Sequence, residues 1–360
     1  MLPLLICCTV LISVSTLLPM SRHSHWMVRG LDFLRLQIGS LAALLLLAHI
    51  FFLDLHATTA WALIAVTTIC VFWQLWWILP YTFLWPKEVI DSIDADSDRK
   101  LCILTSNVLT TNRNAETLLR LVQTHRPDIL VTLESDQWWE NNLKALEPDM
   151  PHSIRCPLDN LYGMHVFSRL PLYEPEISFL VEDDVPSMHA MVKMRSGDEV
   201  RVHFVHPAPP SPTENPESAE RDAELIIVGR SVAESKQPVI VTGDLNDVAW
   251  SATTRLFRKI SGLLDPLVGR GMFNTFHVGF PFLRWPLDHI FHSEHFTLRL
   301  IDRLPSIGSD HFPLLTCLTL ANSTGDMQEG LRADEADLDW AAQITQAQDV
   351  KKSDVPQPGE

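Results

Sequence analysis

Three long stretches without a charged side chain open the sequence, and they restrict its possible folds more than any other feature. They cover residues 2–20, 36–53 and 60–84 and are 19, 18 and 25 residues long. About 20 apolar residues are enough to cross a bilayer as a helix, so residues 1–86 are predicted to form three transmembrane helices. Trp and Tyr side chains near the ends of the third stretch are typical of a membrane interface. The alternatives are a soluble core of three helices and a cleaved signal peptide over residues 1–20.

The loops between these stretches predict an orientation. Residues 21–35 hold Arg22, Arg29 and Arg35, whereas residues 54–59 hold no Lys or Arg. Basic loops tend to stay in the cytoplasm, so the first loop is expected on the cytoplasmic side. Three crossings then place everything after residue 86 on that side too. Cleavage of the first stretch, or a cytoplasmic amino terminus, would turn the remainder outward.

The rest of the chain is acidic. The chain has 28 basic and 44 acidic residues. Three of the basic and two of the acidic residues lie in residues 1–86, which leaves 25 basic and 42 acidic residues in residues 87–360. Such a surface is a poor non-specific partner for nucleic acid, which requires basic groups, but it attracts divalent cations. The six cysteines have neither zinc-type spacing nor a pattern that implies structural disulfides.

Residues 87–100 form a polar linker, and from Leu101 to about residue 320 short apolar runs alternate with helical patterns. The clearest predicted strand, residues 239–243, leads directly into Asp244, Leu245 and Asn246. Side chains alternate along an extended chain, so Asp244 and Asn246 are expected to point to the same side. Residues 321–360 are acidic with little apolar periodicity and are predicted to be disordered, although residues 338–344 also fit a short helix.

Further polar residues stand at the ends of predicted strands, where functional groups concentrate. They are Asn107 after residues 101–104, Glu134 after 129–133, His206 after 200–205, Asp288 within 287–291, and Asp310 and His311 before 314–320. Each could be a cap or turn residue when taken alone. Together they are of the types that bind a hard cation, polarise a phosphate and move a proton.

The ordered motifs resemble those of the endonuclease/exonuclease/phosphatase superfamily, which has a deoxyribonuclease-like fold. They are Ser-Asn107-Val, Leu-Glu134-Ser, His206-Pro, Gly-Asp244-Leu-Asn246, Leu-Asp288-His-Ile and Ser-Asp310-His311. The resemblance covers about residues 100–320. It implies an α/β domain at residues 101–320, in which a two-sheet β-sandwich is flanked by helices in four layers. The added membrane region resembles a bacterial membrane-anchored subgroup, which implies a multi-pass protein of the inner membrane.

The resemblance also implies metal-dependent hydrolysis of a phosphodiester or phosphomonoester by direct attack of water. It assigns the metal, Mg²⁺ or Mn²⁺, to Glu134, Asn107 and Asp310, the water to Asp244, and the phosphate to Asn246, His206 and His311, with Asp288 holding His311. The chemistry of the side chains is compatible with these roles. Carboxylate oxygens are ligands for Mg²⁺, and a carboxylate beside an imidazole fixes its tautomer.

The substrate stays open among nucleic acid, phospholipid and small phosphoesters, and no protein partner is implied. A membrane tether favours a membrane substrate because it raises the local concentration. A second class of function is a catalytically silent membrane scaffold that binds a partner through the same fold. The ordered set of acid, amide and histidine groups argues against it. Tyr162 fits either a site-lining or a packing role, and Arg221-Asp222 is interpreted as an ion pair on a helix face.

Overall fold

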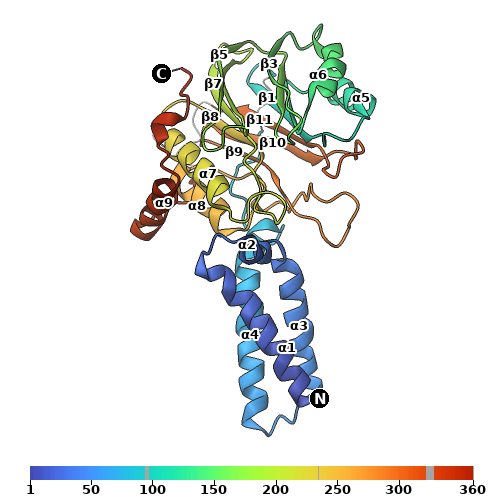
Figure 1. Ribbon diagram of the computed structural model, residues 1–360, viewed down its shortest axis with the longest axis vertical. Coiled ribbons are helices and arrows are strands. Elements are labelled where there is room, and N and C mark those ends of the chain that lie inside the picture. The colour runs from blue at the N-terminus through green and yellow to red at the C-terminus, as the bar shows by residue number, and fades with distance from the viewer. Residues whose placement is uncertain (94–96, 234, 322–327, 360) are drawn as a thin grey trace.

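The computed structural model describes residues 1–93, 97–233, 235–321 and 328–359. A bundle of long helices carries a domain of two β-sheets at one end (Figure 1). The amino terminus lies at the far end of the bundle, and the carboxyl terminus lies beside the sheets.

Within the described residues, three helices are long and apolar enough to cross a membrane, as the sequence predicts. The candidate spans are Leu2–Ser21, Arg35–Phe52 and Thr58–Tyr81. They contain α1 (Leu2–Leu17) with η1 (Leu18–Ser21), α3 (Arg35–Phe52), and α4 (Thr58–Ile78) with η2 (Leu79–Tyr81). No more than 28% of each span is buried within the protein, so most of its apolar side chains face outward.

Polar side chains link these helices in the centre of the bundle. The His49 ring lies 3.2 Å from the Thr9 hydroxyl and 3.4 Å from the Thr67 hydroxyl, and Gln74 donates to Thr16 at 3.1 Å. Such hydrogen bonds hold helices together where water cannot compete. The short α2 (Trp26–Phe33) lies across the end of the bundle that faces the sheets (Figure 1).

The first sheet has six strands in the order β10-β11-β1-β2-β4-β3. Its strands are β1 (Lys100–Asn107), β2 (Ile129–Leu133), β3 (His152–Cys156), β4 (Met164–Ser168), β10 (Phe296–Arg303) and β11 (Leu314–Leu320). The second sheet has five strands in the order β5-β6-β7-β8-β9. Its strands are β5 (Leu172–Ser178), β6 (Ser187–Lys193), β7 (Glu199–Val205), β8 (Val239–Asp244) and β9 (Asp288–His292).

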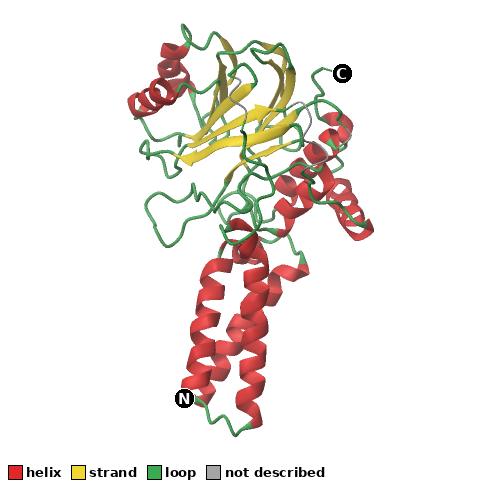
Figure 2. Cartoon of the chain, turned by 180° about the vertical axis from the view of Figure 1, so that it is seen from behind, coloured by secondary structure: helices red, strands yellow, loops and turns green. Residues whose placement is uncertain are grey.

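The two sheets pack face to face around one apolar core. Val131 and Val166 come from the first sheet, and Val202, Phe204 and Ile240 come from the second. Helices cover both outer faces of the sandwich (Figure 2), which confirms the predicted four-layer α/β fold. These helices are α5 (Ala115–His125), α6 (Gln137–Leu143) with η3 (Lys144–Leu146), α7 (Ala219–Val232) and α8 (Ala252–Ser261).

The predicted disorder of the tail is wrong for residues 328–359. They form α9 (Glu335–Ala347) and η4 (Lys352–Asp354), while residues 322–327 and 360 lie outside the described part of the chain. A capping box between Asp334 and Asp337 starts α9. Ala341 is fully buried against α7 and α8, so tertiary packing orders a segment whose own periodicity is weak.

The cysteine pattern does not imply a structural disulfide, but Cys102 and Cys317 form one. The two cysteines lie directly opposite each other in the antiparallel pair β1–β11, with their Cα atoms 4.0 Å apart. They are 215 residues apart in sequence, and only the register of the strands brings them together.

Candidate active site

The polar groups predicted at strand ends meet at one edge of the sandwich. The parallel pairs β1–β2 and β7–β8 end there, beside Glu134 and His206. The first residue of β9, Asp288, is the register partner of the last residue of β8, Asp244, because these strands are antiparallel. His311 approaches from the loop before β11 and contacts both carboxylates.

Gly243 explains how Asp244 reaches this position. Its φ angle is +152°, and a Cβ atom at this residue would lie 1.8 Å from the carbonyl oxygen of Val205 in β7. Only glycine lets the two strands approach this closely. The next side chain, Asp244, is thereby placed at the edge of the sheet and is buried there.

His311 lies between two buried carboxylates. Its Nδ1 atom is 2.8 Å from Asp288 Oδ2, and its Nε2 atom is 3.5 Å from Asp244 Oδ2. Burial alone would lower the pKa of His311, but Asp288 and Asp244 raise it to about 10. Burial would likewise raise the pKa of Asp244, but the charge of His311 holds it below its ordinary value. An imidazolium beside a carboxylate is therefore the stable state of this pair near neutral pH.

Asn107 connects this pair to Glu134. Its Nδ2 atom donates to Glu134 Oε1 at 2.7 Å and to Asp244 Oδ2 at 3.2 Å, while its Oδ1 atom accepts from the backbone N–H of Leu109. Glu134 has a φ angle of +55°, so its backbone turns sharply after β2. Burial raises the pKa of Glu134 to about 7, and the charges of Asp310 and Asp244 contribute in the same direction.

The residues around Glu134 fit a divalent cation. Its second oxygen, Oε2, is buried and has no hydrogen-bond partner among the described residues. Asp310 is close enough for its charge to act on Glu134. Asp244, Asp288 and His311 also present ligand atoms within 4.8 Å of one another. In that second group His311 is paired with both carboxylates, although Asp288 Oδ1 has no hydrogen-bond partner among the described residues, and a protonated imidazole does not bind a metal.

Asn246 is held in a fixed position next to Asp244. Its backbone N–H donates to Asp244 Oδ1 at 2.9 Å, and its side-chain Nδ2 donates to the carbonyl of Pro207 at 3.0 Å. Its φ angle is +51°, a conformation that asparagine tolerates better than most residues. The second hydrogen of Nδ2 is left to contact a ligand.

His206 lies on the other side of Asp244, and it is buried. Its Nδ1 atom has no partner among the described residues. Burial lowers the pKa of His206 to about 4, so the ring is neutral near pH 7. Tyr162 packs against it, with ring centroids 5.4 Å apart, and donates its hydroxyl to Glu214. Tyr162 therefore packs beside His206, and its role in lining the site stays a prediction.

The sequence analysis missed the support beneath Asn246. Arg221 is buried in α7; it donates to the Asn246 carbonyl at 2.8 Å, pairs with Asp222 at 2.8 Å and lies 3.5 Å from Asp247. The predicted ion pair of Arg221 with Asp222 is present on α7, but it is buried and not exposed to solvent. No local sequence pattern reveals such contacts, since they join residues 25 positions apart.

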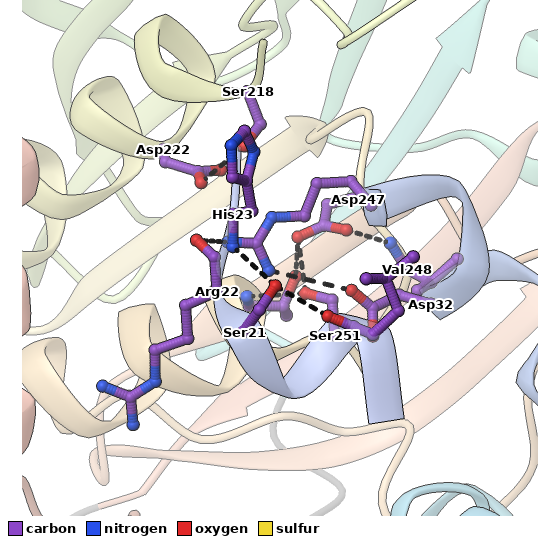
Figure 3. Close-up of polar contacts among 12 residues, drawn as sticks. Ser21, Arg22, His23, Asp32, Ser218, Asp222, Asp247, Val248 and Ser251 are labelled. Atoms are coloured by element: carbon purple, nitrogen blue, oxygen red, sulfur yellow. Dashed lines mark hydrogen bonds and ion pairs between the residues drawn. The ribbon is translucent and has the colours of Figure 1, made fainter. Parts of the chain in front are cut away.

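Asp247 in turn connects this loop to the membrane region. It accepts hydrogen bonds from the Val248 N–H and from the hydroxyls of Ser251 and Thr254. Figure 3 shows Asp247, Ser251 and Asp32 of α2 in one cluster. Trp250 Nε1 donates to the Asp32 carbonyl at 2.8 Å. The loop that carries the active-site residues thus rests directly on the end of the helical bundle.

Comparisons with known proteins agree with this architecture. A two-sheet sandwich with acidic, amide and histidine groups at one edge is the fold of a large class of phosphoester hydrolases. The sequence signature described as "Endonuclease/Exonuclease/phosphatase family" matches residues 104–311, and the chain belongs to this family. Family members are metal-dependent phosphoesterases and nucleases. No curated protein matches the chain in sequence.

Solved structures share the fold at low identity. TDP2 of D. rerio, complexed with a single-strand DNA product, is 18% identical with a TM-score of 0.50; the match covers 62% of this chain and 100% of that one. The human Nocturnin catalytic domain is 19% identical with a TM-score of 0.51, covering 62% and 94%. An endonuclease/exonuclease/phosphatase from Beutenbergia cavernae is 16% identical with a TM-score of 0.51, covering 62% and 72%.

Proposed function

We propose that this chain is a membrane-anchored phosphoesterase that depends on a divalent metal and hydrolyses its substrate by direct attack of water. The observation that supports this most strongly is His311 between Asp288 and Asp244, with Asn107 joining Asp244 to Glu134. The arrangement places the positively charged His311 and the carboxylate of Asp244 side by side at one edge of the sandwich. Pairs of this kind bind a phosphate and activate a nucleophile at the same time.

Each residue of the site has its own role in the proposed reaction. Asp244 orients the attacking water and accepts its proton. His311 and the free hydrogen of the Asn246 amide donate to phosphate oxygens as negative charge builds up on them. Asp288 holds the His311 ring in position and keeps it protonated. His206, which is neutral, contacts the phosphate from the opposite side of Asp244.

The metal fits at Glu134. In this proposal Glu134 and Asp310 supply carboxylate oxygens, and Asn107 holds Glu134 in place. Mg²⁺ or Mn²⁺ would supply positive charge that polarises the phosphoryl group. The partnerless Oε2 atom and the raised pKa of Glu134 both favour a cation there, because a positive charge would offset the burial of a carboxylate.

A direct test uses the full chain in nanodiscs, since α2 and α9 pack on the domain. Hydrolysis of bis(p-nitrophenyl) phosphate is expected with Mg²⁺ or Mn²⁺ and should stop in excess chelator. Glu134→Gln should require a higher metal concentration than the wild type. Activity that persists in chelator would contradict the metal dependence. A folded protein that is inactive with both metals would favour the silent-scaffold alternative.

The membrane region also provides evidence on which side of the membrane the catalytic domain faces. The loop arginines Arg22, Arg29 and Arg35 favour a catalytic domain on the cytoplasmic side. Two of these arginines, Arg29 and Arg35, are buried and lie near Asp32, so their charges are partly neutralised within the membrane region and carry less weight as loop charges. The Cys102–Cys317 disulfide is typical of oxidising compartments. We therefore propose that the domain faces the side of the membrane away from the cytoplasm.

Nucleic acid is the less favoured substrate. The D. rerio TDP2 structure contains a single-strand DNA product, but its likeness to this chain lies in the fold. This chain has a net charge of −16, whereas proteins that bind nucleic acid neutralise phosphates with basic surfaces.

A further inference from the structure

One loop joins the active site to the membrane helices. Residues 276–285 lie between α8 and β9 and are closed at the base by a β-bridge between Phe276 and Trp285. Inside the loop, Leu283 N–H donates to the Phe280 carbonyl at 3.0 Å, and the Arg284 side chain donates to the carbonyls of His277 and Val278. Figure 1 shows this orange segment projecting beside the domain toward the upper end of α3. Hydrogen bonds within the loop therefore give it a defined conformation.

The tip of the loop is apolar and exposed. Phe282 is 91% exposed, Phe280 57% and Leu283 41%. Clustered side chains of this size in water indicate a contact surface. Residues 266–287 contain no Asp or Glu, although the chain carries a net charge of −16. The tip thus lacks the negative charge that would repel an anionic lipid surface.

The backbone of the tip lies level with the beginning of a candidate membrane span. Gln37, in the first turn of α3, donates its Nε2 hydrogen to the carbonyl of Phe282 at 2.9 Å. Trp285 packs on Phe33 at the end of α2, with ring centroids 5.6 Å apart. Leu36, the neighbour of Gln37, is also an exposed apolar residue. The loop therefore sits where the bilayer surface must lie if α3 crosses the membrane.

The base of the same loop forms a wall of the active site. The Phe276 ring packs against His311 with centroids 4.9 Å apart, and the two residues form a β-bridge. The Val278 N–H donates to the Asp310 carbonyl at 2.8 Å. Phe276, which contacts His311, is thus only a few residues along the chain from the exposed tip.

We propose that residues 276–285 are an interfacial loop that inserts Phe280, Phe282 and Leu283 into the bilayer around α1, α3 and α4. The substrate is then a phosphoester carried by a lipid headgroup of that bilayer, and this second statement rests on the proposed function. Water would add to the phosphorus, the phosphorus–oxygen bond to the leaving group would break, and the leaving oxygen would take up a proton. The loop would hold the active site at the depth of the headgroups.

The first experiment tests the membrane contact without using activity. The photoreactive residue p-benzoylphenylalanine is placed at position 282, and at position 173 as a control, in full chains in nanodiscs of phosphatidylethanolamine and phosphatidylglycerol. Tyr173 is 46% exposed and lies in β5, toward the end of the sheet opposite the active site. Lipid adducts are expected at position 282 and not at 173. The positive control is position 44, because Leu44 lies in α3 and is 63% exposed. The absence of adducts at 282, with adducts at 44 in the same nanodiscs, would overturn the loop assignment.

The second experiment tests the substrate class with a variant outside the catalytic residues. Phe280→Ser/Phe282→Ser should keep hydrolysis of bis(p-nitrophenyl) phosphate within about twofold, and it should lower release of the phospholipid headgroup phosphate by about tenfold or more, because the loop no longer holds the active site at the depth of the headgroups. Tyr173→Ser should change neither rate. Wild-type protein that hydrolyses the soluble ester but no phospholipid would overturn the lipid substrate. Wild-type protein that hydrolyses neither would overturn the proposed function, while lipid adducts at position 282 would still support the loop.

Discussion

At the scale of single residues, the active site depends on buried groups that fix one another. Asn246 provides the clearest case, because Arg221 holds its carbonyl from below while Asp244 accepts its N–H. In the proposed mechanism the side chain can donate to a phosphate only if this backbone keeps its conformation at a φ angle of +51°. Under that proposal Arg221 is a positioning residue, and it acts through Asn246.

Arg221→Lys should lower kcat by about tenfold with little change in KM. Lysine keeps the charge but cannot reproduce the fork that reaches Asp222 and the Asn246 carbonyl together. Steady-state kinetics on bis(p-nitrophenyl) phosphate measure this. Arg230→Lys, further along α7 and paired with Thr345, is the matched control and should leave kcat unchanged. An Arg221→Lys enzyme with wild-type kcat would show that Asn246 needs no such support.

Glu224 provides a prediction about stability and pH. It is buried in α7, and burial raises its pKa from 4.5 to about 8 in the folded protein. Below pH 4.5 both states hold the proton, and between pH 4.5 and 8 only the folded state does, so this group lowers stability as pH rises through that range. Glu224→Gln should therefore stabilise the protein at pH 8–9 by about 2–4 kcal/mol and have little effect at pH 4.

Chemical denaturation at the two pH values measures the difference. Glu220→Gln, one turn earlier on the same helix at a partly exposed position, is the control and should change stability little. Equal effects of Glu224→Gln at both pH values would mean that folding does not raise the pKa of Glu224.

At the scale of secondary-structure elements, the sequence predicts what is buried and apolar. The strands β1, β2, β8 and β11 are apolar runs, and their ends correctly indicate where Asn107, Glu134 and Asp244 lie. The edge strand β5 reads Leu-Tyr-Glu-Pro-Glu-Ile-Ser and is largely exposed, so it has no apolar run to detect. Pairing with β6 alone defines it.

The tail helix shows the same limit. Its burial against α7 and α8 is a tertiary contact, which the acidic composition of residues 321–360 does not reveal. Ala341→Asp should lower stability by about 2–4 kcal/mol, because it buries a charge without a partner. Leu338→Asp, at a position that is 51% exposed on the same helix, should have little effect. Thermal unfolding of both variants measures this, and equal melting temperatures would show that α9 does not pack stably on the domain.

At the scale of the whole molecule, the helical bundle and the domain form one unit. Tyr81, at the end of the third candidate span, donates to the carbonyl of Ala249, and Trp250 donates to Asp32. The sequence predicted the membrane region and the catalytic domain as separate parts joined by a linker. It could not predict that α2 supports the active-site loop, because these contacts join residues about 200 positions apart.

The orientation of this unit can be measured with fusions after residue 360, expressed in a bacterial inner membrane. If the domain faces away from the cytoplasm, alkaline phosphatase fused there should be active, because it needs its own disulfides, and green fluorescent protein should be dark. If the green fluorescent protein fusion is fluorescent and the alkaline phosphatase fusion is inactive, the domain faces the cytoplasm, as the loop arginines favour.

The measurement that tests the central claim most directly compares wild-type protein with Asp244→Asn. Both are assayed as full chains in nanodiscs with Mg²⁺, and turnover of bis(p-nitrophenyl) phosphate and melting temperature are recorded on the same preparations. Asparagine keeps the size of the side chain but cannot accept the proton of water, so kcat should fall by about 10²-fold or more while the melting temperature shifts by only a few degrees. A folded Asp244→Asn protein with near-normal turnover would contradict the assignment of Asp244 and with it the proposed active site.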